Sequence, residues 1–595
     1  MRLLSTLLLT VIVVLAEAQV PDSLRFDWSR SGLSPAFAAP TTEIDVTTLG
    51  VIPDDGLPEN TALNAALASL PAGGAILKFP AGNYQFSAAV NMPSNCIIRG
   101  AGADSTRFVF NLSGAVNNNF NFYGTGSSTW WGLNGPFTRG SSVFALQGAS
   151  AFFQPGDYVE IRQQNGSWDT NPATWATYSV GHVSRVDSSS ADSVYLSEGI
   201  RLDFSASLNP EIRKIFPVRN SGLECFRMTR TDSTTASVNF GVSYYIASDC
   251  YIRGVESYKS ICSHVIAEIS SHIDISGNYF HESYLYDGSS TRGYGVTLGV
   301  HSVLCRVENN VFRKLRHAMM VKQGANGNVF GYNHSLQPFR SEFPTDFGGD
   351  ISVHGHYPFA NLFEGNNCKN AAIDQAWGPN GPYNTVFRNR IELYGLTISS
   401  GSVQSNQQTL VGNDITSTAV FQGMYSLNGS NHFQYGNRVQ GSITPAGTGS
   451  LSDSSLYLSS TPAFWTGSLP WPSMGIPYTA QANLTPASVR YLSGTQPALC
   501  GSAPVTTSMG PVSSTGELQA LYRNGTWILS WNQDQASPTR IEAFGTNGQL
   551  LGVWNVDGFF GSNRKELDAS VPEGVLLFRI AGSNTNQRLR VYQPR

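Results

Sequence analysis

Charged residues are scarce in this 595-residue chain: Asp, Glu, Lys and Arg make up 13% of it, about half the share typical of soluble domains. The net charge is −4, so the chain lacks the basic field expected of a nucleic-acid-binding protein. No run of 18 apolar residues occurs after the first 18 positions, which argues against an integral membrane segment. The seven cysteines include no C-x-x-C pair, which argues against a zinc or redox site, and their odd number leaves at least one thiol unpaired.

The longest apolar run stands at the start of the chain. Arg2 precedes an apolar stretch from Leu3 to Leu15, and Ala16-Glu17-Ala18 fits the small-x-small rule for a cleavage site. These features predict a signal peptide over residues 1–18 and a secreted or cell-surface protein.

What the chain has in quantity is glycine, with 59 residues, and a regular spacing of Asn and Gly after short apolar stretches. From Asn310 onward the asparagine steps are 310 to 333, 333 to 367, 367 to 389, 389 to 413 and 413 to 437, mostly 22–24 residues with one of 34; the step from 278 to 310 is also long, at 32. Both residues tolerate a left-handed backbone, and stacked Asn side chains can hydrogen-bond from coil to coil. A leucine-rich repeat has the same period, but its L-x-x-L-x-L framework is missing. The spacing therefore predicts a β-helix with two side loops.

The region from Thr41 to Phe110 combines an amphipathic helix near 61–70 with strands and tight turns. Its ordered residues resemble the N-terminal signature of pectate-lyase-like right-handed β-helix proteins: Gly50, Asp54-Asp55-Gly56, Asn60-Thr61-Ala62, Phe79-Pro80-Ala81-Gly82-Asn83-Tyr84 and Gly100-Ala101-Gly102. The resemblance implies an all-β fold, a right-handed parallel β-helix over 41–490 with the helix covering its N-terminal end. It leaves the reaction open, because the family includes lyases, hydrolases, epimerases and phage tailspikes.

Two further parts are expected beside the β-helix. Alternating segments between 142 and 218 predict a small β insertion packed beside the early coils. Residues 494–516 are predicted to be a linker, and 517–595 a C-terminal β-sandwich. The end of the chain, from Gly574 to Ile580 and from Arg588 to Val591, is similar to the sorting domain of type IX secretion, although its proline-rich entry motif is absent. That resemblance implies the secretion machinery as a partner; the alternative is a carbohydrate-binding or spacer domain.

Eight of the ten histidines fall between His264 and His356, an interval that also holds the two predicted groove loops, about 281–295 and 334–350. Aligning the coils on Asn333 and Asn367 places Lys322 beside His356, one strand spacing away. Asp350 and Asp374 are 24 residues apart, or one coil, so their carboxylates are expected to be neighbours and to differ in pKa.

These patterns give two sets of candidate residues. The catalytic candidates are His317, Lys322, Arg316, His354, Asp350 and Asp374. The substrate-binding candidates are His356, His281, Tyr284, Tyr286, Tyr294, Arg340 and Trp377, with sugar contacts also expected from Trp168, Trp175 and Tyr178 of the insertion. No metal ligand is predicted, since His354 and His356 lack a clear third partner.

The favoured function is a polysaccharide lyase acting by β-elimination on a uronic-acid polymer, with His317 or Lys322 as proton abstractor and Arg316 and His354 holding the carboxylate. Pectate-type relatives often use Ca²⁺, so the resemblance leaves open whether this protein needs Ca²⁺ as a cofactor. The Asn-Thr-Asp and Gly-Asp-Asp strings of polygalacturonase-type hydrolases do not occur; Gly348-Gly349-Asp350 is the nearest. The alternatives are an inverting hydrolase using Asp350 and Asp374 and a non-catalytic glycan-binding adhesin.

Overall fold

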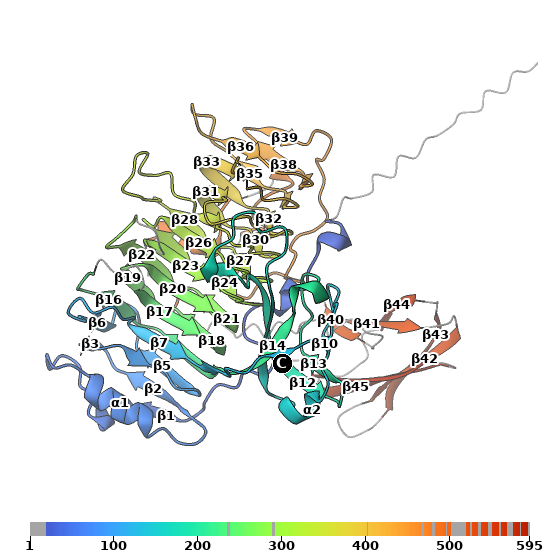
Figure 1. Ribbon diagram of the computed structural model, residues 1–595, viewed down its shortest axis with the longest axis horizontal. Helices are drawn as coiled ribbons and strands as arrows, with labels where there is room; N and C mark the ends of the chain where they lie inside the picture. The colour runs from blue at the N-terminus through green and yellow to red at the C-terminus, as the bar shows by residue number, and fades with distance from the viewer. Residues whose placement is uncertain are drawn as a thin grey trace, which may run out of the picture. The chain divides into compact units, whose positions relative to one another are not determined.

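Parallel strands stacked coil upon coil make up most of the molecule (Figure 1). The computed structural model describes residues 20–234, 239–287, 292–401, 403–465, 469–478, 482–494 and 497–500, and seven strands between 519 and 592. The predicted signal peptide and most of the predicted linker lie outside these residues. The described residues form two compact units, one up to residue 500 and one from residue 519.

The first unit is the predicted parallel β-helix, and each of its coils contributes strands to three walls. The first wall consists, in stacking order, of β1 (Glu43–Asp45), β2 (Ala75–Phe79), β5 (Cys96–Gly100), β15 (Val218–Glu224), β18 (Ala247–Arg253), β21 (Ser271–Ser276), β24 (Arg306–Glu308), β27 (Val329–Gly331), β30 (Leu362–Glu364), β32 (Thr385–Phe387), β34 (Thr409–Val411) and β37 (Phe433–Tyr435). All of these neighbours pair in parallel, so each coil advances the chain by one strand spacing, about 4.8 Å.

The second and third walls share two long strands at their far end. The second wall contains β3 (Gly82–Phe86), β6 (Thr106–Phe110), β16 (Arg227–Arg230), β19 (Glu256–Ser260), β22 (Tyr279–Ser283), β25 (Val311–Arg313), β28 (His334–Leu336), β31 (Asn367–Ile373), β33 (Arg390–Ile398), β35 (Asp414–Ile415), β38 (Asn437–Val439) and the antiparallel β39 (Ser442–Thr444). The third contains β4 (Val90–Asn91), β7 (Phe120–Tyr123), β17 (Phe240–Tyr245), β20 (Ser263–Glu268), β23 (Tyr294–Leu298), β26 (His317–Val321), β29 (Ile351–Val353), the ends of β31 and β33, and β36 (Met424–Leu427).

A ladder of asparagine side chains runs along the turn between the first and second walls. The side-chain amide of each member donates to the side-chain oxygen of the next, over 2.9–3.1 Å, in the order Asn278, Asn310, Asn333, Asn366, Asn389, Asn413 and Asn437. Each amide also donates to a backbone carbonyl of the preceding coil, as Asn333 does to Val307. The ladder passes through Asn366 rather than Asn367, so the coil alignment based on Asn367 was wrong by one residue at this turn.

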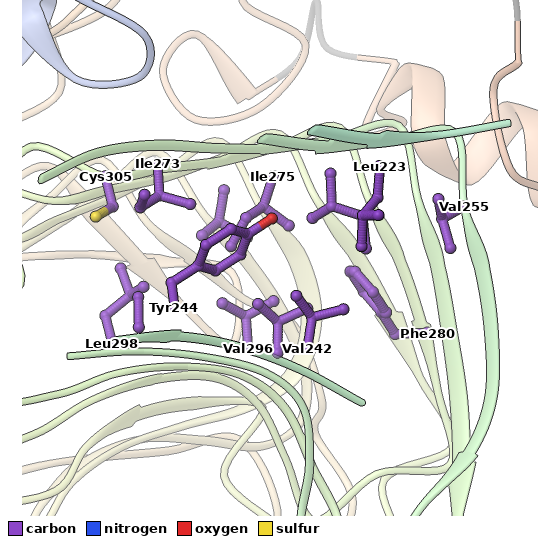
Figure 2. Packing of buried hydrophobic residues seen from close by; sticks show 14 of the residues in the cluster. Leu223, Val242, Tyr244, Val255, Ile273, Ile275, Phe280, Val296, Leu298 and Cys305 are labelled. Carbon is purple, nitrogen blue, oxygen red and sulfur yellow. The ribbon is translucent and has the colours of Figure 1, made fainter. Parts of the chain in front are cut away.

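The interior of the coil is filled by apolar side chains from all three walls. Figure 2 shows Ile273 and Ile275 of the first wall facing Val242, Val296 and Leu298 of the third wall, and all of them are buried. Four buried cysteines outside the disulfide, Cys96, Cys250, Cys305 and Cys368, belong to this same core. They act as small apolar side chains, and burial raises the pKa of the thiols of Cys96 and Cys305 to about 12.

Short helices and a disulfide accompany the coils of the β-helix. Helix α1 (Asn60–Ala68) buries Leu63 and Ala66, and the side chain of Asn60, its first residue, binds backbone groups of Ser87 and Ala88. Helix α3 (Pro486–Leu492) begins with a capping box between Thr485 and Ser488 and packs against β25 in the middle of the second wall. A disulfide joins Cys225 to Cys500, which are 275 residues apart.

The inserted sheet begins earlier than the predicted residue 142, and its contacts extend beyond the early coils. Its elements are β8 (Thr125–Gly126), β9 (Trp131–Gly132), β10 (Val143–Ala145), α2 (Ala149–Phe152), β11 (Tyr158–Gln163), β12 (Val180–Ser189), β13 (Ser193–Leu196) and β14 (Glu211–Phe216). Glu160 hydrogen-bonds to His301, and the Gly181 carbonyl accepts from Asn326. The insertion therefore packs against middle coils of the β-helix, not only the early ones.

The second unit consists of antiparallel strands in two sheets. One sheet has the order β40 (Gln519–Arg523), β41 (Thr526–Gln533) and β44 (Gly561–Leu567). The other has the order β43 (Leu550–Gly558), β42 (Ser537–Phe544), β45 (Val575–Gly582) and β46 (Thr585–Tyr592).

The asparagine ladder yields a stability prediction. Replacing Asn333 by Ala leaves buried partners on two neighbouring coils unsatisfied, so we expect the free energy of unfolding to fall by about 1–3 kcal/mol. Asn134→Ala, at an exposed position of the insertion, serves as the matched control and should leave the thermal midpoint unchanged. Equal thermal midpoints for the two variants would contradict a stabilising role for the asparagine ladder.

Candidate functional site

A row of polar and aromatic side chains follows the outer side of the third wall, at the ends of its strands. Val321, Val353 and Ile373 point into the core and are paired in register. Because side chains alternate along a strand, the next residue of each strand points outward. In stacking order these outward positions are Tyr123, Tyr245, Glu268, Gly299, Lys322, His354 and Asp374.

This register corrects two of the predicted neighbours. Val321 pairs with Val353, so Lys322 lies beside His354 and not beside His356. Val353 pairs with Ile373, so Asp374 lies beside His354 and not beside Asp350. The alignment was wrong because the loop before β29 and the turn at Asn366 each shift the chain, and a shift within a strand changes which side chains are neighbours.

His354 and Asp374 form a hydrogen-bonded pair at the last two positions of the row. The His354 Nδ1 atom lies 2.7 Å from Asp374 Oδ2, and the side chains are 13% and 22% exposed. Burial alone would raise the pKa of Asp374, but the charge and hydrogen bond of His354 hold it below its usual value. A carboxylate bonded to Nδ1 fixes the imidazole with its Nε2 lone pair available for a proton.

His317 lies next to this pair at the start of β26. Its ring centroid is 5.4 Å from that of His354 and 4.7 Å from that of Tyr294, and the residue is 8% exposed. Nδ1 lies 2.9 Å from the Gly349 carbonyl oxygen, to which it donates, while the buried Nε2 atom has no hydrogen-bond partner among the described residues. Burial, together with the charges of His354 and Arg316, lowers the pKa of His317 to about 3, so the ring is neutral at physiological pH.

A second polar atom without a partner lies beneath the row. Ser352 is two residues before His354 and so faces the same side of the wall, and its buried hydroxyl has no hydrogen-bond partner in the described chain. Buried polar groups are nearly always satisfied, and those left open often mark a functional site. The open hydroxyl and the open Nε2 of His317 both lie below the surface of the groove.

Two cations flank the histidines. Lys322 is half-buried, with Nζ 3.6 Å from Glu268 Oε1. Arg316 immediately precedes His317, close enough for its charge to influence the pKa values of His317 and Tyr294, and its guanidinium makes no hydrogen bond or ion pair with a described residue. The groove around neutral His317 therefore holds both cations and the carboxylates of Glu268 and Asp374.

Asp350 is not available as a partner carboxylate. It is buried, and its oxygens accept from the Ser335 hydroxyl at 2.9 Å and from the backbone N–H of Lys369 at 2.6 Å. Burial raises its pKa to about 6. Its contacts are those of a carboxyl that holds β28, β29 and β31 together.

The structure places five of the predicted substrate-binding residues in other contacts. His281 stacks on Tyr279 in the second wall and binds Glu256, and His356 ties the coil to the insertion through Asn171. The others hold the groove loops, as Tyr284 bonds to Arg230, Tyr286 to Lys314 and Arg340 to Pro344. Of the predicted loop 281–295, residues 288–291 lie outside the description.

Tyr294 and Trp377 do lie at the site, and the insertion adds Trp175. The ring of Trp377 is 6.4 Å from that of His354 and 6.0 Å from that of Trp175. Glu268, Tyr245 and Tyr123 were missed as members of the outward row. Tyr123 and Tyr245 are paired across 122 residues because the insertion separates them, so the coil period could not reveal their proximity.

No cluster of three or more His, Cys, Asp or Glu side chains with metal-binding geometry occurs among the described residues. None of the helices in the described ranges is both long and apolar enough to cross a membrane.

No known family model and no curated protein matches the chain. Among solved structures, the tailspike gp61 of Pseudomonas phage phi297 aligns over 89% of this chain and 100% of that chain, with a TM-score of 0.50 and 12% identity. The Fri1 bacteriophage tailspike of Acinetobacter baumannii, a capsular polysaccharide depolymerase, covers 93% and 80%, with a TM-score of 0.32 and 11% identity. The A-module of an Azotobacter vinelandii mannuronan C-5 epimerase covers 66% and 99%, with a TM-score of 0.32 and 14% identity. The phi297 tailspike and this chain share a fold; the other two overlap more loosely.

The state of His317 can be tested through pH. Its pKa is about 3 when folded and about 6.5 when unfolded, so the unfolded chain takes up a proton that the folded chain refuses, and stability falls as the pH drops below about 6.5. His317→Asn keeps an N–H donor for Gly349 and removes this titration. We expect the loss of stability between pH 7 and pH 4.5 to shrink by on the order of 2–3 kcal/mol, measured by denaturant unfolding. An unchanged loss would mean that His317 is protonated in the folded protein.

Proposed function

We propose that the protein is a polysaccharide lyase that cleaves a uronate-containing polymer by β-elimination in the groove along the third wall. The observation that carries this proposal is the His354–Asp374 pair beside two cations, Arg316 and Lys322. A base next to positive charge is what removal of a proton α to a carboxylate requires.

The reaction places each group in a defined role. Nε2 of His354 takes the C5 proton of the uronate, and the electron pair left behind forms the C4–C5 double bond. The C4–O bond breaks, its electrons leave with the oxygen of the departing sugar, and solvent protonates that oxygen. Arg316 and Lys322 neutralise the carboxylate while negative charge develops on it. Asp374 orients the imidazole and stabilises its protonated form.

This assignment revises the role expected for His317. A histidine with a pKa near 3 is a poor proton acceptor at neutral pH, because the driving force for proton transfer follows basicity. The exposed edge of His354 and its bond to Asp374 make it the better base. We assign His317 to substrate positioning, through the open lone pair on Nε2.

The hydrolase alternative fits the groove less well. Asp350 is enclosed by backbone N–H groups, and Asp374 is paired with His354. The other carboxylate of the row, Glu268, is four strand steps from Asp374, or about 19 Å at the usual strand spacing. Inverting hydrolases need two carboxyl groups about 6.5–9.5 Å apart.

The export route belongs to the same proposal. A polymer-degrading enzyme must reach its substrate, and the leader at 1–18 together with the C-terminal strands of 519–592 suits a protein carried to the cell surface or beyond. Recognition of the C-terminal unit by type IX secretion machinery would be lost on truncation before residue 517.

Elimination is tested by incubating the protein with pectic, alginate and glycosaminoglycan polymers while recording ultraviolet absorbance and reducing ends. We expect both signals to rise together, because elimination leaves an unsaturated uronate. His354→Ala and Asp374→Asn should lower kcat by about 100-fold or more, the usual contribution of a positioned base. His432→Ala, at a partly buried histidine outside the row, is the matched control and should retain activity.

Three outcomes would contradict the proposal. Reducing ends without ultraviolet absorbance would indicate hydrolysis. Tight binding without any shortening of the polymer would indicate a glycan-binding surface protein. Full activity in His354→Ala would exclude His354 as the base.

A further inference from the structure

Two tryptophans stand exposed beside the proposed catalytic histidine and come from distant parts of the chain. Trp175 is 51% exposed and Trp377 is 37% exposed, although tryptophan is usually well buried. Their ring centroids are 6.0 Å apart with an angle of 73° between the planes. The two indoles thus form an aromatic corner, which presents a face and an edge to a ligand.

Both indoles are held in place by hydrogen-bonded turns. Asp374 accepts from the backbone N–H of Ala376 at 3.0 Å, so the carboxylate that orients His354 also shapes the turn carrying Trp377. Trp175 lies on a short 3₁₀ turn, and the Asn165 side chain closes the surrounding loop through Ala176 and Ser179. Rigid aromatic side chains lose little conformational entropy on binding, which makes them effective platforms.

The aromatic corner lacks the cations found elsewhere in the groove. No described Lys or Arg makes a cation–π contact with either indole, and the ionisable rings beside it are those of His356, 5.0 Å from Trp175, and His354, 6.4 Å from Trp377, each paired with an aspartate. Two basic side chains near the second wall are already paired, Arg313 with Glu282 and Lys369 with Glu392.

A polymer with a carboxylate on every sugar would need a cation at each position that it occupies. Arg316, which makes no ion pair with a described residue, and the loosely paired Lys322 supply positive charge at the two ends of β26 and not at the indoles. A carboxylate stacked in the aromatic corner would meet no described Lys or Arg against the indoles, and burying an unpaired charge there is unfavourable. The apolar face of an uncharged sugar suits the indoles better.

We infer that the substrate is an acidic heteropolysaccharide in which a uronate alternates with uncharged sugar. The uronate lies between Arg316 and Lys322, and an uncharged sugar stacks in the corner of Trp175 and Trp377. This assignment rests on the proposed function for the location of the cleaved uronate, while the pattern of charge and aromatic surface is independent of the chemistry. The insertion then acts as a specificity element, because it contributes Trp175 to a groove built by the coils.

The test measures binding by the inactive His354→Ala protein, so that chemistry does not affect the result. The probes are hyaluronan and chondroitin, in which uronate alternates with an uncharged amino sugar, polygalacturonate, in which every sugar is a uronate, and laminarin, which is neutral. We expect at least one alternating polymer to bind at least tenfold more tightly than polygalacturonate or laminarin. Trp175→Ala and Trp377→Ala, introduced separately, should each weaken that binding by about tenfold.

Tyr195→Ala supplies the matched control, since this aromatic side chain is exposed on β13 of the same insertion and has no described contact with the site residues. It should leave binding unchanged. The inference is overturned if polygalacturonate or laminarin binds as tightly as the alternating polymers, if no alternating polymer binds, or if the tryptophan variants behave like Tyr195→Ala. Tryptophan-dependent binding of an alternating polymer without an unsaturated product in the wild-type protein would overturn the lyase proposal and leave this inference standing.

Discussion

The buried ladder of side-chain amides at the turn between the first and second walls is the interaction on which the remaining structure depends. The side-chain oxygen of each asparagine accepts from the backbone N–H of the preceding coil, and its amide donates to a carbonyl of the preceding coil and to the asparagine of the next, as the contacts of Asn333 and Asn366 show. Because all seven members are buried, a slipped coil would leave amide groups unsatisfied at considerable cost. The ladder therefore holds the register of every strand that follows the turn.

A fixed register places side chains of successive coils next to one another on one face of the wall. The coil brings Lys322, His354 and Asp374, which are widely spaced in sequence, to successive rungs about 4.8 Å apart. Residues in the core of the wall alternate with these outward positions, so the groove is supported by a rigid, well-packed layer. The same rigidity permits atoms such as Nε2 of His317 to remain buried without a partner, ready for a ligand.

The insertion shows how a regular solenoid acquires an individual binding surface. It leaves the coil after β7 and returns at β15, yet its contacts reach His301, Asn326 and His356 several coils further on. Those contacts carry Trp175 to the proposed catalytic row. A repeat that is uniform in its core thus becomes specific through a segment that is not part of the repeat.

The sequence by itself determined the period of the coil, the class of fold and the segment that holds the histidines, because these depend on local spacing and on turn chemistry that Asn and Gly express directly. It also indicated His354, Asp374, Lys322 and Arg316 as members of one site. It could not decide between Asn366 and Asn367 as the ladder residue, and it could not show that Ile351 of β29 pairs with Ala371 of β31, which separates Asp350 from Asp374. Only the tertiary structure decided that Asp350 is enclosed, that His317 is buried and neutral, and that Trp175 reaches Trp377. The physical reason is that side-chain neighbours in a β-helix follow from the lengths of the loops between strands, and a change of one residue in a loop leaves the local pattern intact while it changes every contact across the wall.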